Sequence, residues 1–217
     1  MKKKKVLIVV AHPDDETIWM GGTLLMNKNK WDTTIISLCR KDDKDRAPKF
    51  KKVCKIIKAK CFISELEDEK LNELQLEEIT KRIEKLSPRK DYDYIFTHGT
   101  NGEYGHIRHK EVHNSVDKMI KNKQLSCNKL LFFSYATKDK ICRADKNSDK
   151  LIRLEDTILT EKKYLIHNVY GFDKGSFEEK SSRKIEAFKL NKKNEVFNTI
   201  RIPNRGRWTK SSRRFTS

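Results

Sequence analysis

The sequence predicts an α/β fold in which helices cover both faces of a mostly parallel sheet. Short apolar runs rich in β-branched residues alternate with longer segments of helical periodicity. The connections between the apolar runs are too long for hairpins, so successive strands are expected to run parallel. A length of 217 residues suits one such domain and is ample for a buried core.

The first strand is expected at residues 6–11, which are apolar without alternation, as in a strand buried on both faces. Four lysines precede this run and give the start a likeness to a signal peptide. The run is only six residues long, however, and leads into His12-Pro13-Asp14-Asp15 rather than into a small-residue cleavage site. A β-strand is therefore the better interpretation.

The following segments continue the alternation as far as residue 135. Helices are expected at residues 17–29, 49–60, 71–86 and 107–121. Strands are expected at residues 33–38, 61–63, 94–97 and 130–135. The clearest helical stripe belongs to residues 71–86, with apolar side chains at Leu71, Leu74, Ile79, Ile83 and Leu86. A charged loop follows the second strand, and a Gly-rich loop follows the fourth.

Beyond about residue 136 the pattern is weaker. Helices are expected at residues 161–169 and 177–190, a strand at residues 195–202, and a frayed basic end at residues 205–217. We therefore expect one domain over residues 1–217. Its core would lie at about residues 5–135, and about residues 136–217 would form a small irregular C-terminal extension.

The composition excludes several classes of protein. No apolar run approaches the roughly 20 residues that cross a bilayer, so no transmembrane segment is expected. The five cysteines form no CxxC pair, which disfavours a disulfide framework and favours a reducing, cytoplasmic location. The net charge of +18 would attract polyanions, but the lysines are scattered evenly and no RNA-binding signature is present. No nucleic-acid partner is expected.

Most of the histidines fall where a parallel sheet places its ligands, beyond the carboxyl ends of the strands. Five of the six histidines lie in or beside the loops that follow the first, second and fourth strands. The paired carboxylates Asp14 and Asp15 lie there too, and only His167 lies elsewhere. This clustering predicts a functional site at that edge of the sheet.

The first motif at this edge is His12-Pro13-Asp14-Asp15-Glu16. Pro13 fixes its own φ and biases His12 away from helix, so the motif forms a rigid turn. One imidazole and two carboxylates on a rigid turn suit a catalytic zinc ion, which takes N and O ligands at about 2.0–2.2 Å. An aspartate that only caps a helix would explain one carboxylate but not the pair beside a histidine.

The second motif is a row of three histidines, His106, His109 and His113. On a helix their offsets of three and seven place them within an arc of about 60°. They also climb about 10 Å along the helix axis, so one metal ion cannot bind all three. One is expected to be a ligand, another to serve acid–base or oxyanion chemistry, and the third to have a supporting role.

Together, the His-Pro-Asp-Asp-Glu turn and Tyr104-Gly105-His106-x-x-His109 resemble the PIG-L/LmbE-like zinc N-deacetylases. This family includes N-acetylglucosaminyl-phosphatidylinositol deacetylases and the deacetylases of mycothiol and bacillithiol synthesis. The resemblance covers roughly residues 5–135. It implies a Rossmann-like fold, with the whole chain as one LmbE-like deacetylase domain. It also implies that His12, Asp15 and His109 hold Zn²⁺, that Asp14 is the general base, and that His106 and Tyr104 serve the transition state.

The activity implied by the resemblance is hydrolysis of a linear amide C–N bond. An acetyl group would leave an N-acetylated amino sugar, such as an N-acetylglucosamine conjugate. Zinc lowers the pKa of its bound water, and Asp14 would accept the proton so that the zinc-bound hydroxide attacks the carbonyl carbon. Tyr104 or protonated His106 would donate a hydrogen bond to the oxyanion. Either His106 or Asp14 would protonate the leaving amine, and the sequence leaves that choice open.

One departure from the family pattern is that Ile107-Arg108 stands where members often have Pro-Asp. Arg108 is therefore expected to add a positive charge near the mouth of the site. Arg40, Arg46 and Asn101 lie on loops at the same edge and are expected to contact sugar hydroxyls or a phosphate. Supporting rather than catalytic roles are expected for Glu16, at the start of a helix, and His98, at the end of a strand.

Two other functions remain as alternatives. A metal-dependent phosphoesterase would suit the basic surface, but such sites bind two metals through more carboxylates than lie near these loops. A non-enzymatic, basic nucleic-acid-binding protein would leave the His-Pro-Asp-Asp turn unexplained. The expected partner is a small-molecule N-acetylated sugar conjugate. A phosphate or lipid linkage and a homo-oligomeric state both remain open.

Overall fold

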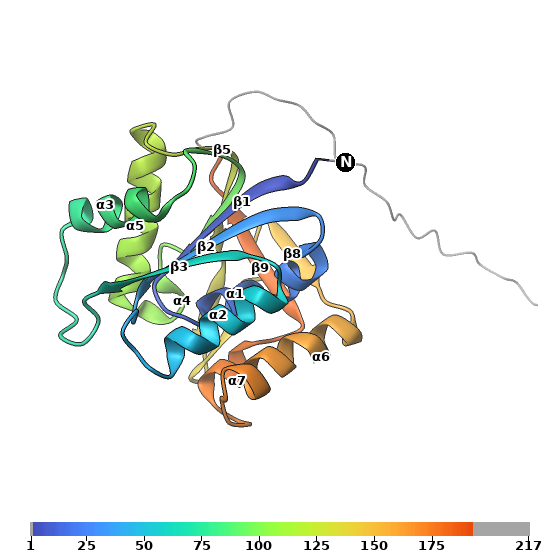
Figure 1. The fold of residues 1–217 in the computed structure, drawn as a ribbon. Helices are drawn as coiled ribbons and strands as arrows, with labels where there is room; N and C mark the ends of the chain where they lie inside the picture. The colour runs from blue at the N-terminus through green and yellow to red at the C-terminus, as the bar shows by residue number, and fades with distance from the viewer. Residues whose placement is uncertain (1, 193–217) are drawn as a thin grey trace, which may run out of the picture.

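A seven-stranded sheet forms the centre of the computed structural model, which describes residues 2–192 (Figure 1). The strand order is β3-β2-β1-β4-β5-β9-β8. The first five strands in that order are parallel, and β9 is antiparallel to both of its neighbours. Their bounds are β1 Lys4–Val10, β2 Trp31–Cys39, β3 Lys60–Leu66, β4 Asp91–Thr97, β5 Ser126–Phe133, β8 Lys150–Arg153 and β9 Ile185–Leu190. The predicted α/β fold is confirmed.

Helices cover both faces of the sheet, as Figure 1 shows. One face packs against α1 (Asp15–Asn27), α2 (Arg46–Ile56) and the π-helix η1 (Leu165–Val169). The other face packs against α3 (Leu76–Leu86) and α5 (Ile107–Lys121). Because alternate residues of a strand point to opposite faces, β1 contributes Val6, Ile8 and Val10 to one core and Leu7 and Val9 to the other. The uninterrupted apolar run at residues 6–10 follows from this double burial.

The parallel strands end at one common edge, and this edge positions the site. β1 leads into His12, β2 into Arg40 and β4 into His98. β3 is longer than expected and extends to Leu66, so the acidic loop that follows it begins at the same edge. The short helix α4 (Gly102–Gly105) and the start of α5 complete this end of the molecule.

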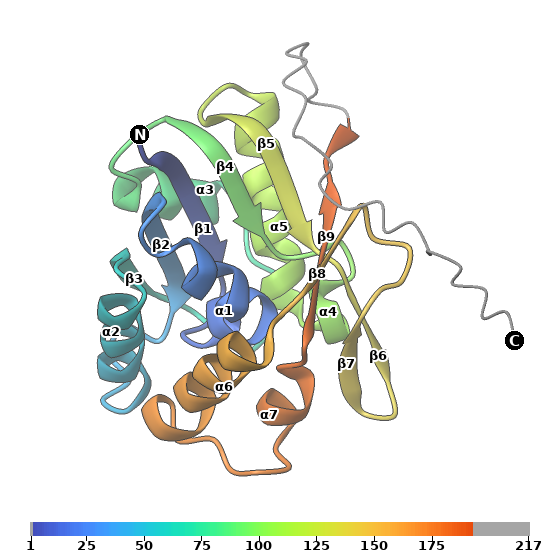
Figure 2. The ribbon, with the colours of Figure 1, turned by 90° about the vertical axis from the view of Figure 1, so that its right-hand side faces the viewer.

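The C-terminal part is more regular than expected. The helix predicted at residues 177–190 is wrong beyond α7 (Phe177–Ser181), because residues 185–190 form β9 and pair with β5 and β8 (Figure 2). Residues 161–169 are helical as expected, in α6 (Asp156–Tyr164) and η1. A hairpin of β6 (Tyr135–Lys138) and β7 (Ile141–Ala144) was not expected. The predicted strand at residues 195–202 and the basic end at residues 205–217 lie outside the described residues.

A buried ion pair explains why β9 escaped the sequence analysis. Glu186 lies inside β9 and accepts hydrogen bonds from the Lys162 ammonium at 2.7 Å and from the backbone N–H groups of Gly22 and Thr23, each at 2.8 Å. The pairing satisfies a carboxylate in a fully buried position. A strand with a buried glutamate lacks the alternation that identifies strands in a sequence.

Within residues 2–192, no helix combines the length and the apolar character needed to cross a membrane. The five cysteines all fall in this range, and all five are free thiols.

Candidate metal centre

The three residues expected to hold zinc converge on one point at the carboxyl edge of the sheet. His12 Nδ1 lies 3.2 Å from His109 Nε2 and 3.3 Å from Asp15 Oδ2. His109 Nε2 lies 3.4 Å from the same Asp15 oxygen. Ligand atoms bound tetrahedrally to zinc at about 2.0–2.2 Å lie about 3.3–3.6 Å apart. Two imidazoles and one carboxylate at this spacing therefore fit a zinc ion.

The turn after β1 holds the first two of these donors. Asp14 has a φ of 127°, a conformation that L-residues rarely adopt, and this reversal directs the chain from the strand into α1. The His12 backbone N–H donates to Asp15 Oδ2 at 2.8 Å. The other oxygen of Asp15 accepts the Trp19 indole N–H at 3.0 Å. The Asp15 carboxylate is thus fixed from two sides before any ion binds.

Carboxylates behind the two histidines select the nitrogens that face the metal position. His12 Nε2 donates to Asp68 Oδ1 at 2.9 Å, and His109 Nδ1 donates to Glu103 Oε2 at 2.6 Å. Each bond leaves the opposite ring nitrogen available as a ligand, as is usual for metal-bound histidines. Neither Asp68 nor Glu103 was expected to have a role in the site. Asp68 follows a strand at the correct edge, and that position is the signal that could have identified it.

The charges of this cluster are strongly coupled. Burial opposes ionisation of Asp15, but His109, His98 and His12 outweigh that effect and hold the pKa of Asp15 well below its usual value. Burial likewise opposes the charge on His12, but Asp15 and Asp68 raise the pKa of His12 to about 10. Burial is the main reason that the pKa of His109 is lowered. Without metal, the site therefore holds a carboxylate and a neutral His109 beside a protonated His12.

His98 supports the centre from behind, in line with the hydrogen-bonded role expected for it. Its ring is fully buried and stacks on His109, with 3.9 Å between ring centroids. His98 Nε2 accepts the Ala11 N–H at 2.9 Å, and His98 Nδ1 donates to the same Glu103 oxygen as His109. His113, one turn further along α5, donates to the His98 carbonyl oxygen at 2.8 Å. His113 is thus directed away from the metal position.

Asp14 lies beside the three donors and is held by its own partners. The Arg46 guanidinium forms an ion pair with Asp14 and also lies 4.7 Å above the Phe172 ring. The Asp14 backbone N–H donates to Glu16, whose carboxylate also accepts the Tyr170 hydroxyl at 2.7 Å. Burial and the charge of Asp15 raise the pKa of Asp14 well above its usual value, and Arg46 opposes that rise. A raised carboxylate pKa suits a general base.

Tyr104 and His106 line the same pocket, Tyr104 from α4 and His106 from the N-cap position of α5. His106 Nδ1 accepts the Arg108 backbone N–H at 3.2 Å and so caps α5, which leaves the proton of the neutral ring on Nε2. Burial, and then the positive charge of His12, lower the pKa of His106 to about 4. His106 is therefore neutral near pH 7 in the metal-free protein, and a protonated His106 during catalysis stays a prediction. Burial raises the pKa of Tyr104, so its hydroxyl stays a hydrogen-bond donor.

Arg108 does not lie at the mouth of the site, so that expectation is wrong. Its side chain is fully buried and forms ion pairs with Glu111 at 2.7 Å and Glu67 at 2.6 Å. Two nearby carboxylates compensate its charge, which is why a guanidinium can be buried here. Its positive charge is directed into the protein and away from any substrate.

The three residues expected to bind substrate have different surroundings. Arg40 and Arg46 line the pocket that also contains His12, Asp14 and Asp15. Asn101 does not: it lines a separate hollow, its Nδ2 donates to the Tyr135 carbonyl oxygen at 2.8 Å, and its Oδ1 accepts the Glu103 N–H. Both ends of the Asn101 amide are thus occupied in holding the loop that carries Glu103.

The pocket over the metal position has a volume of about 170 Å³. Two of its lining residues, Phe177 and Glu178, come from α7 and were missed because the C-terminal part carries no recognisable motif. The Phe177 ring lies 5.0 Å from the Tyr104 ring in an edge-to-face arrangement. The C-terminal part therefore supplies one wall of the site.

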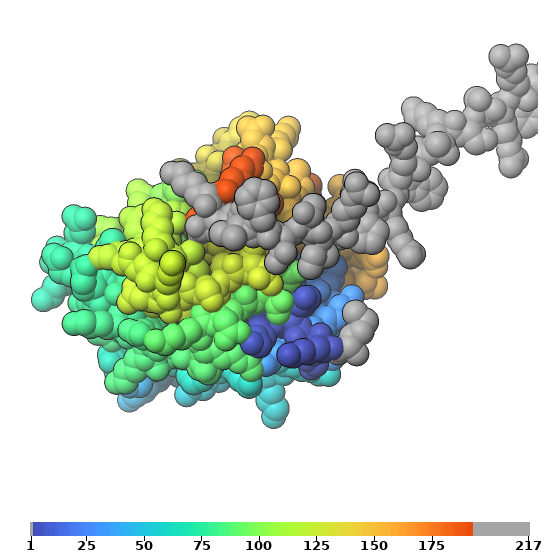
Figure 3. All heavy atoms as spheres, turned by 90° about the horizontal axis from the view of Figure 1, so that it is seen from above, coloured from blue at the N-terminus to red at the C-terminus, as the bar shows by residue number. Residues whose placement is uncertain are grey.

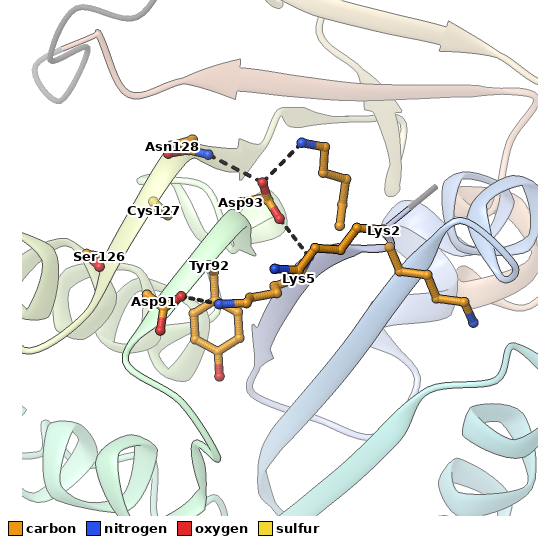
Figure 4. A pocket seen from close by; sticks show the side chains of 10 residues that line it. Lys2, Lys5, Asp91, Tyr92, Asp93, Ser126, Cys127 and Asn128 are labelled. Carbon is orange, nitrogen blue, oxygen red and sulfur yellow. Dashed lines mark hydrogen bonds and ion pairs between the residues drawn. The ribbon is translucent and has the colours of Figure 1, made fainter.

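A larger hollow of about 390 Å³ lies at the opposite edge of the sheet, where β1, β4 and β5 begin (Figure 4). Part of its lining comes from the N-terminal segment. This segment is blue in Figure 3, where it lies at the surface of the molecule beside parts of the chain coloured green. The hollow is lined by Lys2–Lys5, and Lys4 and Lys5 form ion pairs with Asp93 and Asp91. No histidine lines it, so its chemistry differs from that of the metal centre.

Comparisons with known proteins give one family and one fold. The profile of the family described as "PIG-L: GlcNAc-PI de-N-acetylase" matches residues 7–120. An uncharacterised protein of Acanthamoeba polyphaga mimivirus is 28% identical over 124 residues, which are 51% of this chain and 55% of that protein. The chain thus spans about half the length of this curated relative.

Solved structures resemble most of the described fold. N,N′-diacetylchitobiose deacetylase from Pyrococcus horikoshii has a TM-score of 0.64 at 14% identity, with 86% of this chain and 83% of that chain covered. The 4-carboxy-2-hydroxymuconate hydratase from Pseudomonas putida has a TM-score of 0.65 at 11% identity, with 92% and 99% covered. These two proteins are named for different reactions, so the likeness establishes the fold and leaves the activity to the site.

The family profile covers more than half of the chain, and residues 7–120 include both the His-Pro-Asp-Asp turn and the histidines of the second motif. The chain therefore belongs to the PIG-L family of GlcNAc-PI de-N-acetylases.

Proposed function

We propose that the protein is a zinc-dependent hydrolase that removes an acetyl group from an N-acetylated amino sugar. The observation that carries the proposal is the triangle of His12, Asp15 and His109 donor atoms, with sides of 3.2–3.4 Å, beside a pocket that His12, Asp14 and Asp15 line. Family membership supports the reaction type. Zinc at this position would supply a Lewis acid that polarises the acetamide carbonyl and acidifies a water molecule.

Asp14 is the proton carrier in this proposal. It accepts a proton from the attacking water, and Arg46 keeps its carboxylate directed into the pocket. The hydroxyl of Tyr104 and the Nε2–H of neutral His106 donate hydrogen bonds to the oxyanion. Burial holds the pKa of His106 below its usual value in the metal-free protein, so we assign this ring no spare proton near pH 7. Asp14 is therefore the group that returns the proton to the leaving amine.

The pocket also limits what the substrate can be. A volume of about 170 Å³ is small for a ligand pocket, so it holds the acetamido end of a single sugar. The rest of a conjugate would pass between two unlike walls. Tyr104 and Phe177 offer aromatic surface to the apolar face of a sugar ring, and Arg40, with 44% of its side chain exposed, offers donors to hydroxyls or a phosphate.

Acetate release tests the function directly. Zinc-loaded protein should release acetate from at least one N-acetylglucosamine conjugate in a panel of free, thiol-linked, nucleotide-linked and lipid-linked sugars. The same protein after chelation should release none. One zinc per chain is expected by metal analysis. Two metals with phosphate release would instead indicate a phosphoesterase, and no bound metal would favour the basic binding protein.

Proton release gives a second, independent test of the centre. Zinc binding at pH 7 should displace about one proton, because the pKa of His12 is about 10 in the metal-free protein and a ligand imidazole must be neutral. Asp15 is already ionised and His109 already neutral, so neither has a proton to release when zinc binds. Since His12 stays protonated below its pKa, zinc affinity should fall about tenfold per pH unit as the pH drops towards neutrality. Calorimetry in buffers of different ionisation enthalpy measures the released proton, and a value of zero would mean that His12 is neutral.

A further inference from the structure

Arg108 holds a loop that has no regular structure of its own. Residues 67–75 connect β3 to α3 without helix or strand. Arg108 donates to the Glu67 carbonyl oxygen at 2.5 Å, the Glu67 carboxylate at 2.6 Å and the Asn72 carbonyl oxygen at 2.8 Å. Its partner Glu111 accepts the Leu74 backbone N–H at 2.8 Å. Both ends of the loop are therefore tied to α5.

This loop carries Asp68, the carboxylate behind His12. One Asp68 oxygen accepts from His12 Nε2 at 2.9 Å, and the other accepts from Arg40 at 2.9 Å. Only 6% of the Asp68 side chain is exposed. An irregular loop of this length loses much conformational entropy when it is fixed, so the position of Asp68 depends on contacts from outside the loop. The Arg108 contacts to Glu67 and Asn72 lie on either side of Asp68.

We propose that Arg108 is a positioning residue for the metal centre, because it clamps residues 67–74 and so holds Asp68 against His12. Arg108 directly precedes His109 in the chain. One turn of α5 therefore carries the ligand His109 and also the residue that, through Asp68, orients the ligand His12. The planar fork of arginine, with five donors, reaches all its acceptors at once, which lysine cannot do. The inference rests on the proposed metal site.

Zinc affinity in a double-mutant cycle tests this role. Asp68→Asn should weaken zinc binding by about 10–100-fold, as loss of an outer carboxylate partner usually does. Arg108→Met should give a loss of the same order. If Arg108 acts through Asp68, the double variant should bind zinc no more weakly than Asp68→Asn alone. Arg82→Met is the matched control, because Arg82 pairs with Glu78 and Glu65 at the surface beside β3 and touches neither the loop nor the centre.

Two further measurements and two milder variants separate positioning from general stability. Thermal unfolding of each metal-free variant reports the fold, and hydrogen exchange should show faster exchange of residues 67–75 in Arg108→Met. If Arg108→Met does not fold, Arg108→Lys and Glu111→Gln each remove part of the clamp and should give smaller losses in zinc affinity. Unchanged zinc affinity in folded Arg108 variants, or losses that simply add to that of Asp68→Asn, would overturn the inference. If the wild-type protein binds no zinc, the proposed function itself fails and this role fails with it.

Discussion

Asp14→Asn should bind zinc as tightly as the wild-type protein and yet lose about 10²–10⁴ in kcat, the usual cost of removing a general base. Asparagine keeps the size of the side chain and tolerates a positive φ better than most residues, so the backbone at 127° should survive. The amide cannot accept a proton from water or return one to the leaving amine. Zinc content and acetate release, measured on the same preparation, give the result.

The control for this variant is Asp45→Asn, which makes the same chemical change at an exposed residue that pairs with Lys49 and does not line the pocket. It should keep kcat, because Asp45 belongs to neither the metal centre nor the pocket wall. Asp15→Asn should give the opposite signature from Asp14→Asn, with weak zinc binding as the primary defect. If Asp14→Asn loses the metal while Asp15→Asn keeps it, the two carboxylates have exchanged roles. If both variants keep zinc and full activity, the proposal of a metal hydrolase is wrong.

His109→Ala and His12→Ala should each lose both zinc and activity. The loss of affinity should exceed the roughly 10–100-fold that follows removal of an outer partner, because a ligand itself is missing. His113→Ala is the matched control on the same helix: it is equally a buried histidine, but its Nδ1 is bonded to the His98 carbonyl oxygen. It should lower thermal stability and leave zinc bound. Tight zinc in His109→Ala would require a different histidine ligand.

The site could be anticipated from sequence where its residues are close together in the chain. His12 and Asp15 lie on one turn whose rigidity follows from Pro13, and the histidine spacing limits how many residues of α5 can reach one ion. Asp68 was missed because β3 runs three residues further than its apolar core at residues 61–63 suggests, so its place just beyond the carboxyl end of a strand was not recognised. The acidic residues 67–69 that follow β3 suggest a solvated loop. Only the hydrogen bonds from Arg108, which lies on α5, show that this loop is fixed in place.

Arg108 itself shows a limit of local sequence analysis. A charged side chain beside a predicted ligand is expected to face solvent, because burying an unpaired charge is unfavourable. Burial becomes possible with two partners: Glu111, three residues further along α5, and Glu67, which is 41 residues away in the chain. β9 was missed for the same reason, because its buried Glu186 pairs with Lys162, a residue outside the strand. In both places, the fold satisfies a charge with a partner that no local pattern identifies.

The position of β9 in the sheet has a consequence for how the chain is made. β9 is the last described strand to leave the ribosome, yet it lies between β5 and β8. Until residues 185–190 emerge, β5 is an edge strand, and it can offer its backbone to another nascent chain. The five parallel strands are complete long before this edge is closed. A chain interrupted before β9 would therefore carry an open template for aggregation, even though every residue of the metal triangle had already been synthesised.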